Sequence, residues 1–283
     1  MQEYIPYSIT AAGKSFSLSE PQVMGILNVT PDSFYAGSRM QTETEILRRA
    51  AQILQEGGTI IDIGAYSTRP GAEDITPEEE MSRLRSALVP IQREHPDAFL
   101  SIDTFRADVA KMCVEEYGVQ LINDISGGTL DRSMARTIAR LQVPYVLMHL
   151  KGTPQTMQQA PHYENVVEEV CKYFEEKLRT LQDLGVKDII LDPGFGFGKT
   201  LEHNYQLLNH LQELHQFHRP ILVGMSRKSM IYQLLGNTPE EALNGTTVLN
   251  TISLLQGVHI LRVHDVKACN ETIKLTQTYR NHV

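Results

Sequence analysis

Eight short apolar runs recur along the chain, and each is followed by a segment with the periodicity of an amphipathic helix. Strands are predicted at residues 23–28, 60–64, 99–103, 119–123, 145–149, 189–192, 221–224 and 259–264. The segments between them carry one apolar stripe, as at Ile46, Leu47, Ala50, Ile53 and Leu54. Because the runs lack the polar alternation of a strand with one wet face, we expect parallel strands covered on both sides. Eight such units in 283 residues favour an α/β fold of the closed (β/α)8 TIM-barrel type over an open doubly wound sheet.

Five of these runs stop on polar residues. The residues are Asn28, Asp103, Asn123, Asp192 and the pair Arg262 and His264. The carboxyl ends of barrel strands share one rim, and TIM-barrel active sites are built there. Any one of these residues alone also fits a strand-end turn, a helix cap or a surface ion pair. Their gathering on one rim favours a ligand site.

The chain is predicted to hold a single barrel preceded by a hairpin. Residues 1–20 contain two strand-like segments, 4–8 and 15–18, joined by a turn at Gly13, and they are expected to cover the bottom of the barrel. Residues 21–283 form the barrel, since no linker or low-complexity stretch divides them.

Two connections stand out by their length. Residues 29–42 and 65–75 exceed the roughly 2–6 residues that are usual between a strand and its helix, which is typical of lids and binding loops. We expect both loops to close over the ligand. The helix after the second loop is predicted to begin at Thr76 as N-cap, with Pro77 in its first position and Glu79 placed for a capping box.

Composition excludes several classes of protein. The 26 Lys and Arg residues are outnumbered by 34 Asp and Glu, and no basic run is present, so no nucleic-acid binding is expected. No segment approaches the roughly 20 apolar residues of a membrane helix, and the first 20 residues lack a signal-peptide pattern, so no membrane association is expected. Cys113, Cys171 and Cys269 are odd in number and widely spaced, which favours reduced thiols and a cytoplasmic location.

Eight short motifs occur in the order and spacing of one known enzyme family. They are ILNVTPDSF at residues 26–34, DIG at 62–64, STRP at 67–70, SIDT at 101–104, NDI at 123–125, DPGFGFGK at 192–199, SRKS at 226–229 and RVHD at 262–265. The set resembles dihydropteroate synthase across nearly the whole chain. The chain departs from the family pattern at Ala36, where Asp is usual, and at Ala65, where Gly is usual.

The resemblance implies a transferase of folate biosynthesis. Its reaction would join 6-hydroxymethyl-7,8-dihydropterin diphosphate to 4-aminobenzoate and release pyrophosphate. It also implies Mg²⁺ as cofactor, a homodimer and a target of sulfonamides.

The resemblance assigns four residues to the pterin ring. Asp192 would accept two hydrogen bonds from a ring N–H and the adjacent amino group, a pairing that suits a carboxylate. Asn123 would complement the neighbouring nitrogen, and Lys228 would donate to the ring carbonyl. Asp103 would accept from the dihydro ring and stabilise the cation that develops as pyrophosphate leaves. Asp103, Lys228 and Arg69 are the predicted catalytic residues.

The remaining assignments concern the charged ends of the substrates. Arg262 and His264, one residue apart, face the same way from the last strand, and they are expected to bind pyrophosphate with Thr68 and Arg69. The resemblance places Mg²⁺ on the side-chain oxygen of Asn28, since this cation keeps water and phosphate as most of its ligands. It places the carboxylate of 4-aminobenzoate near Ser229, which we predict to lie at a helix N-terminus.

Two other functions fit part of the pattern. A pterin-binding methyltransferase module would bind the same ring, but it has no diphosphate to hold and leaves Thr68 and Arg69 without a purpose. A Schiff-base aldolase would use Lys228 as its nucleophile, which requires a buried lysine with a lowered pKa. The synthase is preferred because it uses all eight motifs.

Overall fold

Eight parallel strands form the barrel in a computed structural model of the chain, which describes residues 2–11, 13–30, 43–67 and 74–282. The strands are β3 (Gln22–Asn28), β4 (Ile60–Gly64), β5 (Phe99–Asp103), β6 (Leu121–Asp124), β7 (Tyr145–Met148), β8 (Ile189–Asp192), β9 (Leu222–Val223) and β10 (Ile260–Val263). Their order in the sheet is β8-β7-β6-β5-β4-β3-β10-β9, and a bridge between Leu191 and Ile221 joins its two ends. The predicted (β/α)8 barrel is confirmed. Among the barrel strands, the largest shift in a start is at β6, which begins at Leu121 rather than at Val119.

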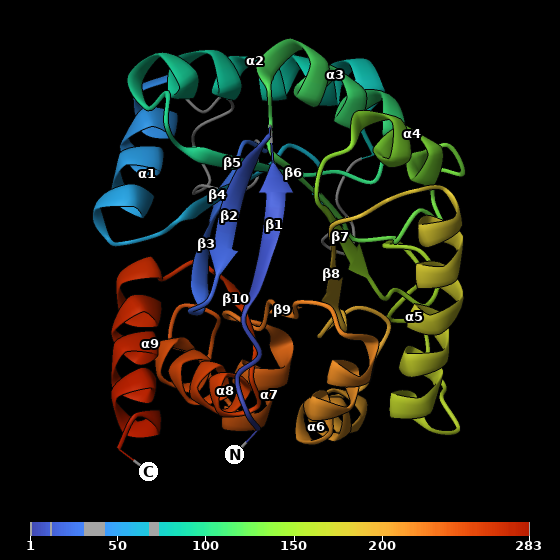
Figure 1. The fold of residues 1–283 in the computed structure, drawn as a ribbon. Coiled ribbons are helices and arrows are strands. Elements are labelled where there is room, and N and C mark those ends of the chain that lie inside the picture. Colours follow the sequence, from blue (N-terminus) through green and yellow to red (C-terminus); the bar gives the residue numbers. More distant parts are fainter. Residues whose placement is uncertain (1, 12, 31–42, 68–73, 283) are drawn as a thin grey trace.

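Helices surround the strands (Figure 1). They are α1 (Glu43–Gln55), α2 (Pro77–Glu94), α3 (Ala107–Tyr117), α4 (Met134–Leu141), α5 (Val166–Asp183), α6 (Leu201–Asn209), α7 (Ser229–Leu235), α8 (Leu243–Leu255) and α9 (Val266–Arg280), and a 3-10 helix, η1, spans Leu211–Phe217. Ile46, Ala50 and Ile53 of the predicted α1 stripe are buried, and its other two members, Leu47 and Leu54, are half-buried. Thr76 caps α2 as predicted, because its Oγ1 accepts the N–H of Glu79 at 3.2 Å. The Glu79 carboxylate bonds Arg83 at 2.8 Å instead of completing a capping box.

The hairpin consists of β1 (Tyr7–Ala11) and β2 (Lys14–Leu18), paired antiparallel. The prediction began the first strand at residue 4, which is three residues too early. Pro6 explains the error, since its missing N–H cannot join a strand ladder.

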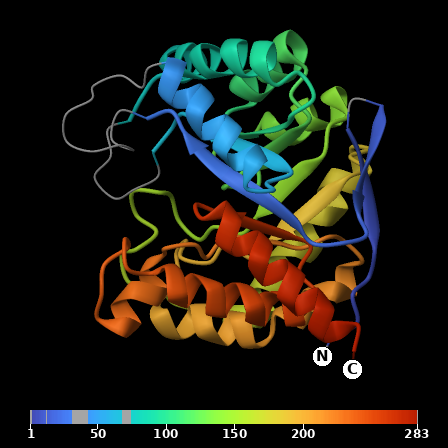
Figure 2. The ribbon, with the colours of Figure 1, turned by 90° about the vertical axis from the view of Figure 1, so that its left-hand side faces the viewer.

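The hairpin seals the bottom of the barrel. Ile9 and Leu18 pack there with one another and with buried strand residues. These residues are Met24, Ile60, Leu121, Val146, Ile190, Leu222 and Ile260. Figure 2 shows the hairpin lying across one end of the strands. A ligand is therefore left with the other end of the barrel, where the strands have their carboxyl termini.

Candidate functional site

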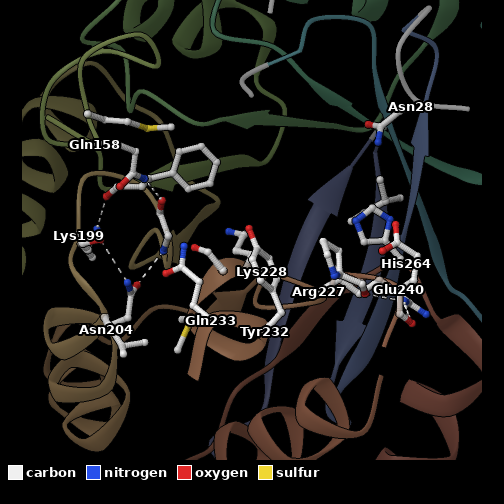
Figure 3. A pocket seen from close by; sticks show the side chains of 18 of the residues that line it. Asn28, Gln158, Lys199, Asn204, Arg227, Lys228, Tyr232, Gln233, Glu240 and His264 are labelled. Atoms are coloured by element: carbon white, nitrogen blue, oxygen red, sulfur yellow. Dashed lines mark hydrogen bonds between the residues drawn. The ribbon is translucent and has the colours of Figure 1, made fainter. Parts of the chain in front are cut away.

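A cavity of about 270 Å³ lies at the carboxyl ends of the barrel strands. Its lining includes the predicted rim residues Asn28, Asp103, Asn123, Asp192, Lys228, Arg262 and His264. A wider groove of about 1170 Å³ shares Asn28, Lys228 and His264 with this cavity and continues past Ser229. In Figure 3, Lys228 lies between Asn28 and His264 on one side and Lys199 and Asn204 on the other. The structure thus brings these predicted site residues together.

Asp62, in the middle of β4, organises the floor of this cavity. Its carboxylate is fully buried and accepts from Arg262 Nε at 2.6 Å, Ser101 Oγ at 2.6 Å and Asn123 Nδ2 at 3.1 Å. Arg262 Nη2 also donates to Asp103 at 2.7 Å. Asp62 belongs to the DIG motif at 62–64, and no role was predicted for it from the sequence. A carboxylate inside an apolar strand was a usable signal, because a buried charge needs partners.

The charges of Arg262 and Asp103 depend on each other. Burial alone would lower the pKa of Arg262, but Asp62 and Asp103 outweigh it and raise that pKa above its ordinary value. Burial raises the pKa of Asp103 above its usual range, and the Arg262 guanidinium opposes only part of that rise. The ion pair therefore holds the Asp103 carboxylate in one orientation.

The His264 imidazole lines this site in its neutral form. Burial and the nearby Arg262 charge lower the pKa of His264 to about 4. Arg262 and His264 were predicted to form the anion site with Thr68 and Arg69, and both line the cavity. However, the Arg262 charge is already shared by two carboxylates, and His264 carries none at neutral pH.

Asp192 and Lys228 are both tied to the loop after β8. Asp192 Oδ1 accepts the N–H of Gly194 at 2.7 Å, and Lys228 Nζ donates to the carbonyl of Phe195 at 2.5 Å. Burial raises the pKa of Asp192, while Lys228 opposes the rise. Burial has the opposite effect on the lysine and lowers the pKa of Lys228 to about 8. Lys228 is the N-cap of α7, so Ser229 begins a helix as predicted.

Asn28 and Asp103 approach each other across Gly64. A Cβ at position 64 would lie 3.3 Å from Asn28 Oδ1 and 3.5 Å from Asp103 Cβ. Glycine therefore keeps the space between these two oxygen-bearing side chains free of a third side chain. No group of three or more His, Cys, Asp or Glu that could hold a metal ion occurs among the described residues. A cation with one or two protein ligands and substrate phosphate, as Mg²⁺ prefers, fits such a place.

A third long connection, missed by the sequence analysis, also borders the site. It runs between β7 and α5, and Met157 and Gln158 from it line the groove. Gln158 Nε2 donates to the carbonyl of Gly196 at 2.7 Å. Met157 belongs to a buried cluster with Ile125, Met148 and Leu150, against which Phe105 and Phe197 pack. The length of this connection was a signal, since it far exceeds the usual few residues.

Part of the predicted site falls outside the described residues. Thr68, Arg69 and Ala36 belong to that part, together with most of the two predicted lid loops. The end of the second loop is described, and there Arg106 Nη2 donates to the carbonyl of Ile75 at 2.6 Å. Ala65 is fully buried.

Comparisons with known proteins identify the family. The family described as pterin binding enzyme matches residues 24–264. The chain is 43% identical over 269 residues to the dihydropteroate synthase of Escherichia coli strain K12, covering 94% of each chain. The chain belongs to the dihydropteroate synthase family. The dihydropteroate synthase of Haemophilus influenzae is 39% identical over 273 residues, covering 96% of this chain and 98% of that one.

A solved structure of the same family has the same fold. The Yersinia pestis dihydropteroate synthase in a sulfonamide drug complex superposes with a TM-score of 0.91 at 41% identity, covering 97% of this chain and 100% of that chain. The chain is accordingly a transferase of folate biosynthesis, and its reaction joins 6-hydroxymethyl-7,8-dihydropterin diphosphate to 4-aminobenzoate. The methyltransferase and aldolase alternatives are set aside, although the lowered pKa of Lys228 is what an aldolase would need.

Proposed function

We propose that the 270 Å³ cavity binds the pterin ring of the substrate and that Asp192, Asn123, Lys228 and Asp103 read its edge. One observation carries the proposal: these four side chains arise from different barrel elements and line one small cavity. A pterin edge alternates donors and acceptors, and carboxylate, amide and ammonium groups together match both kinds.

The chemistry proposed for Asp103 follows from its ion pair. Loss of pyrophosphate leaves positive charge spread into the pterin ring, and a fixed carboxylate beside the ring stabilises that charge as it develops. Arg262 holds Asp103 at 2.7 Å, so little reorientation is needed when the charge appears. The aniline nitrogen of 4-aminobenzoate then attacks the methylene carbon.

The diphosphate and the aminobenzoate are proposed to lie toward the wider groove. Arg262 and His264 would contact the diphosphate with Thr68 and Arg69, His264 acting as a neutral N–H donor. Asn28 would supply a protein oxygen to Mg²⁺, which neutralises phosphate charge when bound. Ser229, which lines the groove, would lie near the aminobenzoate carboxylate. A solved dihydropteroate synthase of Thermus thermophilus is in complex with 4-aminobenzoate, at a TM-score of 0.86 and 35% identity, covering 96% of this chain and 99% of that one.

Calorimetry with a single substitution tests the pterin proposal. Asp192→Asn keeps the shape of the side chain but turns one acceptor into a donor, which mispairs a buried edge and costs on the order of 1–3 kcal/mol. Affinity for the pterin diphosphate should therefore fall by roughly tenfold or more. Asp188→Asn is the matched control, because Asp188 lies just before β8 at the hairpin end, where it accepts from Thr10 N at 3.1 Å. Unchanged pterin affinity in Asp192→Asn would remove Asp192 from the pocket.

We also propose a cytoplasmic homodimer. The three cysteines are free thiols, which suits a reducing compartment. Exposed apolar side chains gather on α7, α8 and α9, a surface called here the α7–α9 face. Its members are Leu234, Leu235, Leu243, Val248, Ile252, Leu275 and Tyr279. An apolar surface of this kind is typical of a protein–protein contact.

A further inference from the structure

Lys199 is a buried lysine to which the proposed chemistry assigns no role. It lies near the end of the loop between β8 and α6, and only 3% of its surface is exposed. Its Nζ lies 2.9 Å from the carbonyl of Gly194, 3.0 Å from the carbonyl of Phe197 and 3.0 Å from Nδ1 of His149. An ammonium has three N–H donors and here has three acceptors. Because a buried charge is costly without such partners, its presence calls for a function.

The histidine partner is consistent with this arrangement. Burial, together with the neighbouring Lys199 charge, lowers the pKa of His149 well below its ordinary value. A neutral imidazole can accept at Nδ1 only when its proton is on Nε2, so the ammonium selects that tautomer. Lys199 thus joins the β8–α6 loop to the end of β7.

The loop that Lys199 holds packs so closely on the chain after β7 that two of its positions require glycine. Gly194 has a φ of 71°, and a Cβ there would lie 2.1 Å from the carbonyl oxygen of His149. Gly198 has a φ of 60° and would meet the carbonyl oxygen of Lys151 at 2.5 Å. These close approaches press the loop onto the chain after β7, and the Lys199 ammonium binds carbonyls at both ends of the turn between them.

The same loop presents two of its peptide groups to the pterin site. The N–H of Gly194 fixes Asp192 Oδ1 at 2.7 Å, and the carbonyl of Phe195 receives Lys228 Nζ at 2.5 Å. One hydrogen bond of Lys199 goes to the carbonyl of Gly194 itself. The charges are linked as well: burial lowers the pKa of Lys199 to about 7, and Asp192 opposes that fall.

We propose that Lys199 is a positioning residue for pterin recognition, which holds the 193–198 loop so that Asp192 and Lys228 point at the pterin edge. The inference rests on the proposed function, because it assumes that Asp192 and Lys228 contact the pterin. The three donors of the Lys199 ammonium are all taken up by protein acceptors, although the residue borders the wider groove. Its contribution therefore passes through the peptide groups of Gly194 and Phe195.

A double-mutant cycle tests this inference, because it separates action through Asp192 from a general loss of stability. Lys199→Met keeps the apolar stem and removes the three hydrogen bonds. Calorimetry with the pterin diphosphate should show affinity lower by about tenfold or more in Lys199→Met. In the background of Asp192→Asn, the same change should cost much less, because the group that it positions is already mispaired. Equal losses in both backgrounds would overturn the inference.

Two further variants complete the experiment. Lys151→Met is the matched control, since Lys151 lies in the neighbouring connection, is exposed and bonds Glu169 at 2.8 Å. It should leave pterin affinity unchanged. Lys199→Gln, which keeps an N–H₂ donor, replaces Lys199→Met in the cycle if thermal unfolding shows that the methionine variant does not fold. Wild-type protein that fails to bind the pterin diphosphate would overturn the proposed function, whereas additivity with a binding wild type overturns only the role of Lys199.

Discussion

At the scale of single residues, the site is an arrangement of shared charges. Arg262 is bonded to Asp62 and Asp103, and all three partners of Asp62 are donors. Such a network costs desolvation free energy, yet it fixes each side chain before a ligand arrives. The cavity is therefore set up for one orientation of a planar ligand.

Asp62→Asn should destabilise the fold strongly. The new amide would keep one acceptor oxygen but turn an N–H₂ group either toward Ser101 or toward the donors of Asn123 and Arg262. The loss of the carboxylate also breaks a buried charge pair, which costs on the order of 3 kcal/mol. Urea denaturation should show this loss in the free energy of unfolding. Asp74→Asn is the control, because the Asp74 side chain is 74% exposed and lies 3.4 Å from Arg106. Such an exposed pair contributes less than about 1 kcal/mol. Similar losses in both variants would contradict the account of the network.

Asp103→Asn should separate catalysis from binding. If the carboxylate stabilises a developing cation, kcat should fall on the order of a hundredfold, while affinity for the pterin diphosphate falls much less. Steady-state kinetics and calorimetry measure the two quantities. Matching losses would reduce Asp103 to an ordinary contact with the ring.

At the scale of elements, His259 links the N-terminal segment to the barrel. Its Nδ1 accepts from Ile221 N at 3.0 Å, and its Nε2 donates to the carbonyl of Ile5 at 2.9 Å. Burial lowers the pKa of His259 to about 4. The histidine just before β10 thus fastens the chain that leads into the hairpin.

This contact makes stability depend on pH. In the unfolded chain His259 takes up a proton below about pH 6.5, but in the folded chain it does so only near pH 4. Its contribution to the free energy of unfolding is therefore complete above pH 6.5 and is lost as the pH falls toward 4. The loss amounts to about 2 kcal/mol at pH 5. Urea denaturation at pH 7.5 and pH 5 should show a smaller acid loss in His259→Gln than in wild type. The exposed control His210→Gln should behave like wild type, and equal acid losses in all three proteins would count against this role.

Sequence patterns predicted the elements better than their contacts. Runs such as 60–64 and 189–192 matched their strands because apolar segments of that length fit a strand covered on both faces. The Asp62 network was not predictable, since it depends on register: Asp62 stands opposite Ser101, and Asp103 opposite Asn123. The role of Lys199 was hidden for a similar reason. The motif at 192–199 could be recognised in the sequence, but the contacts of its loop with His149 could not be predicted from it.

At the scale of the whole molecule, one end of the barrel is closed by the hairpin, the other end holds the cavity, and one flank is apolar. The hairpin seals the bottom, and the polar rim forms the cavity at the top. None of the described helices has the length and hydropathy that a membrane span needs. The apolar flank is the α7–α9 face, whose helices lie along the lower part of Figure 1.

Association through the α7–α9 face should depend on Val248. Val248→Arg would bury a charge in the contact, so sedimentation velocity should show a dimer for wild type and a monomer for the variant. Val89→Arg is the control, because Val89 on α2 is 51% exposed and Val248 is 50% exposed. A variant at Val248 that stays dimeric would place the contact elsewhere.

The central claim is that this barrel rim carries out the condensation. The pure protein would be incubated with 6-hydroxymethyl-7,8-dihydropterin diphosphate, 4-aminobenzoate and Mg²⁺, and dihydropteroate and pyrophosphate would be quantified together. We predict that the two products appear in equal amounts and that both depend on Asp192. Failure to form either product, from a folded protein, would contradict the account.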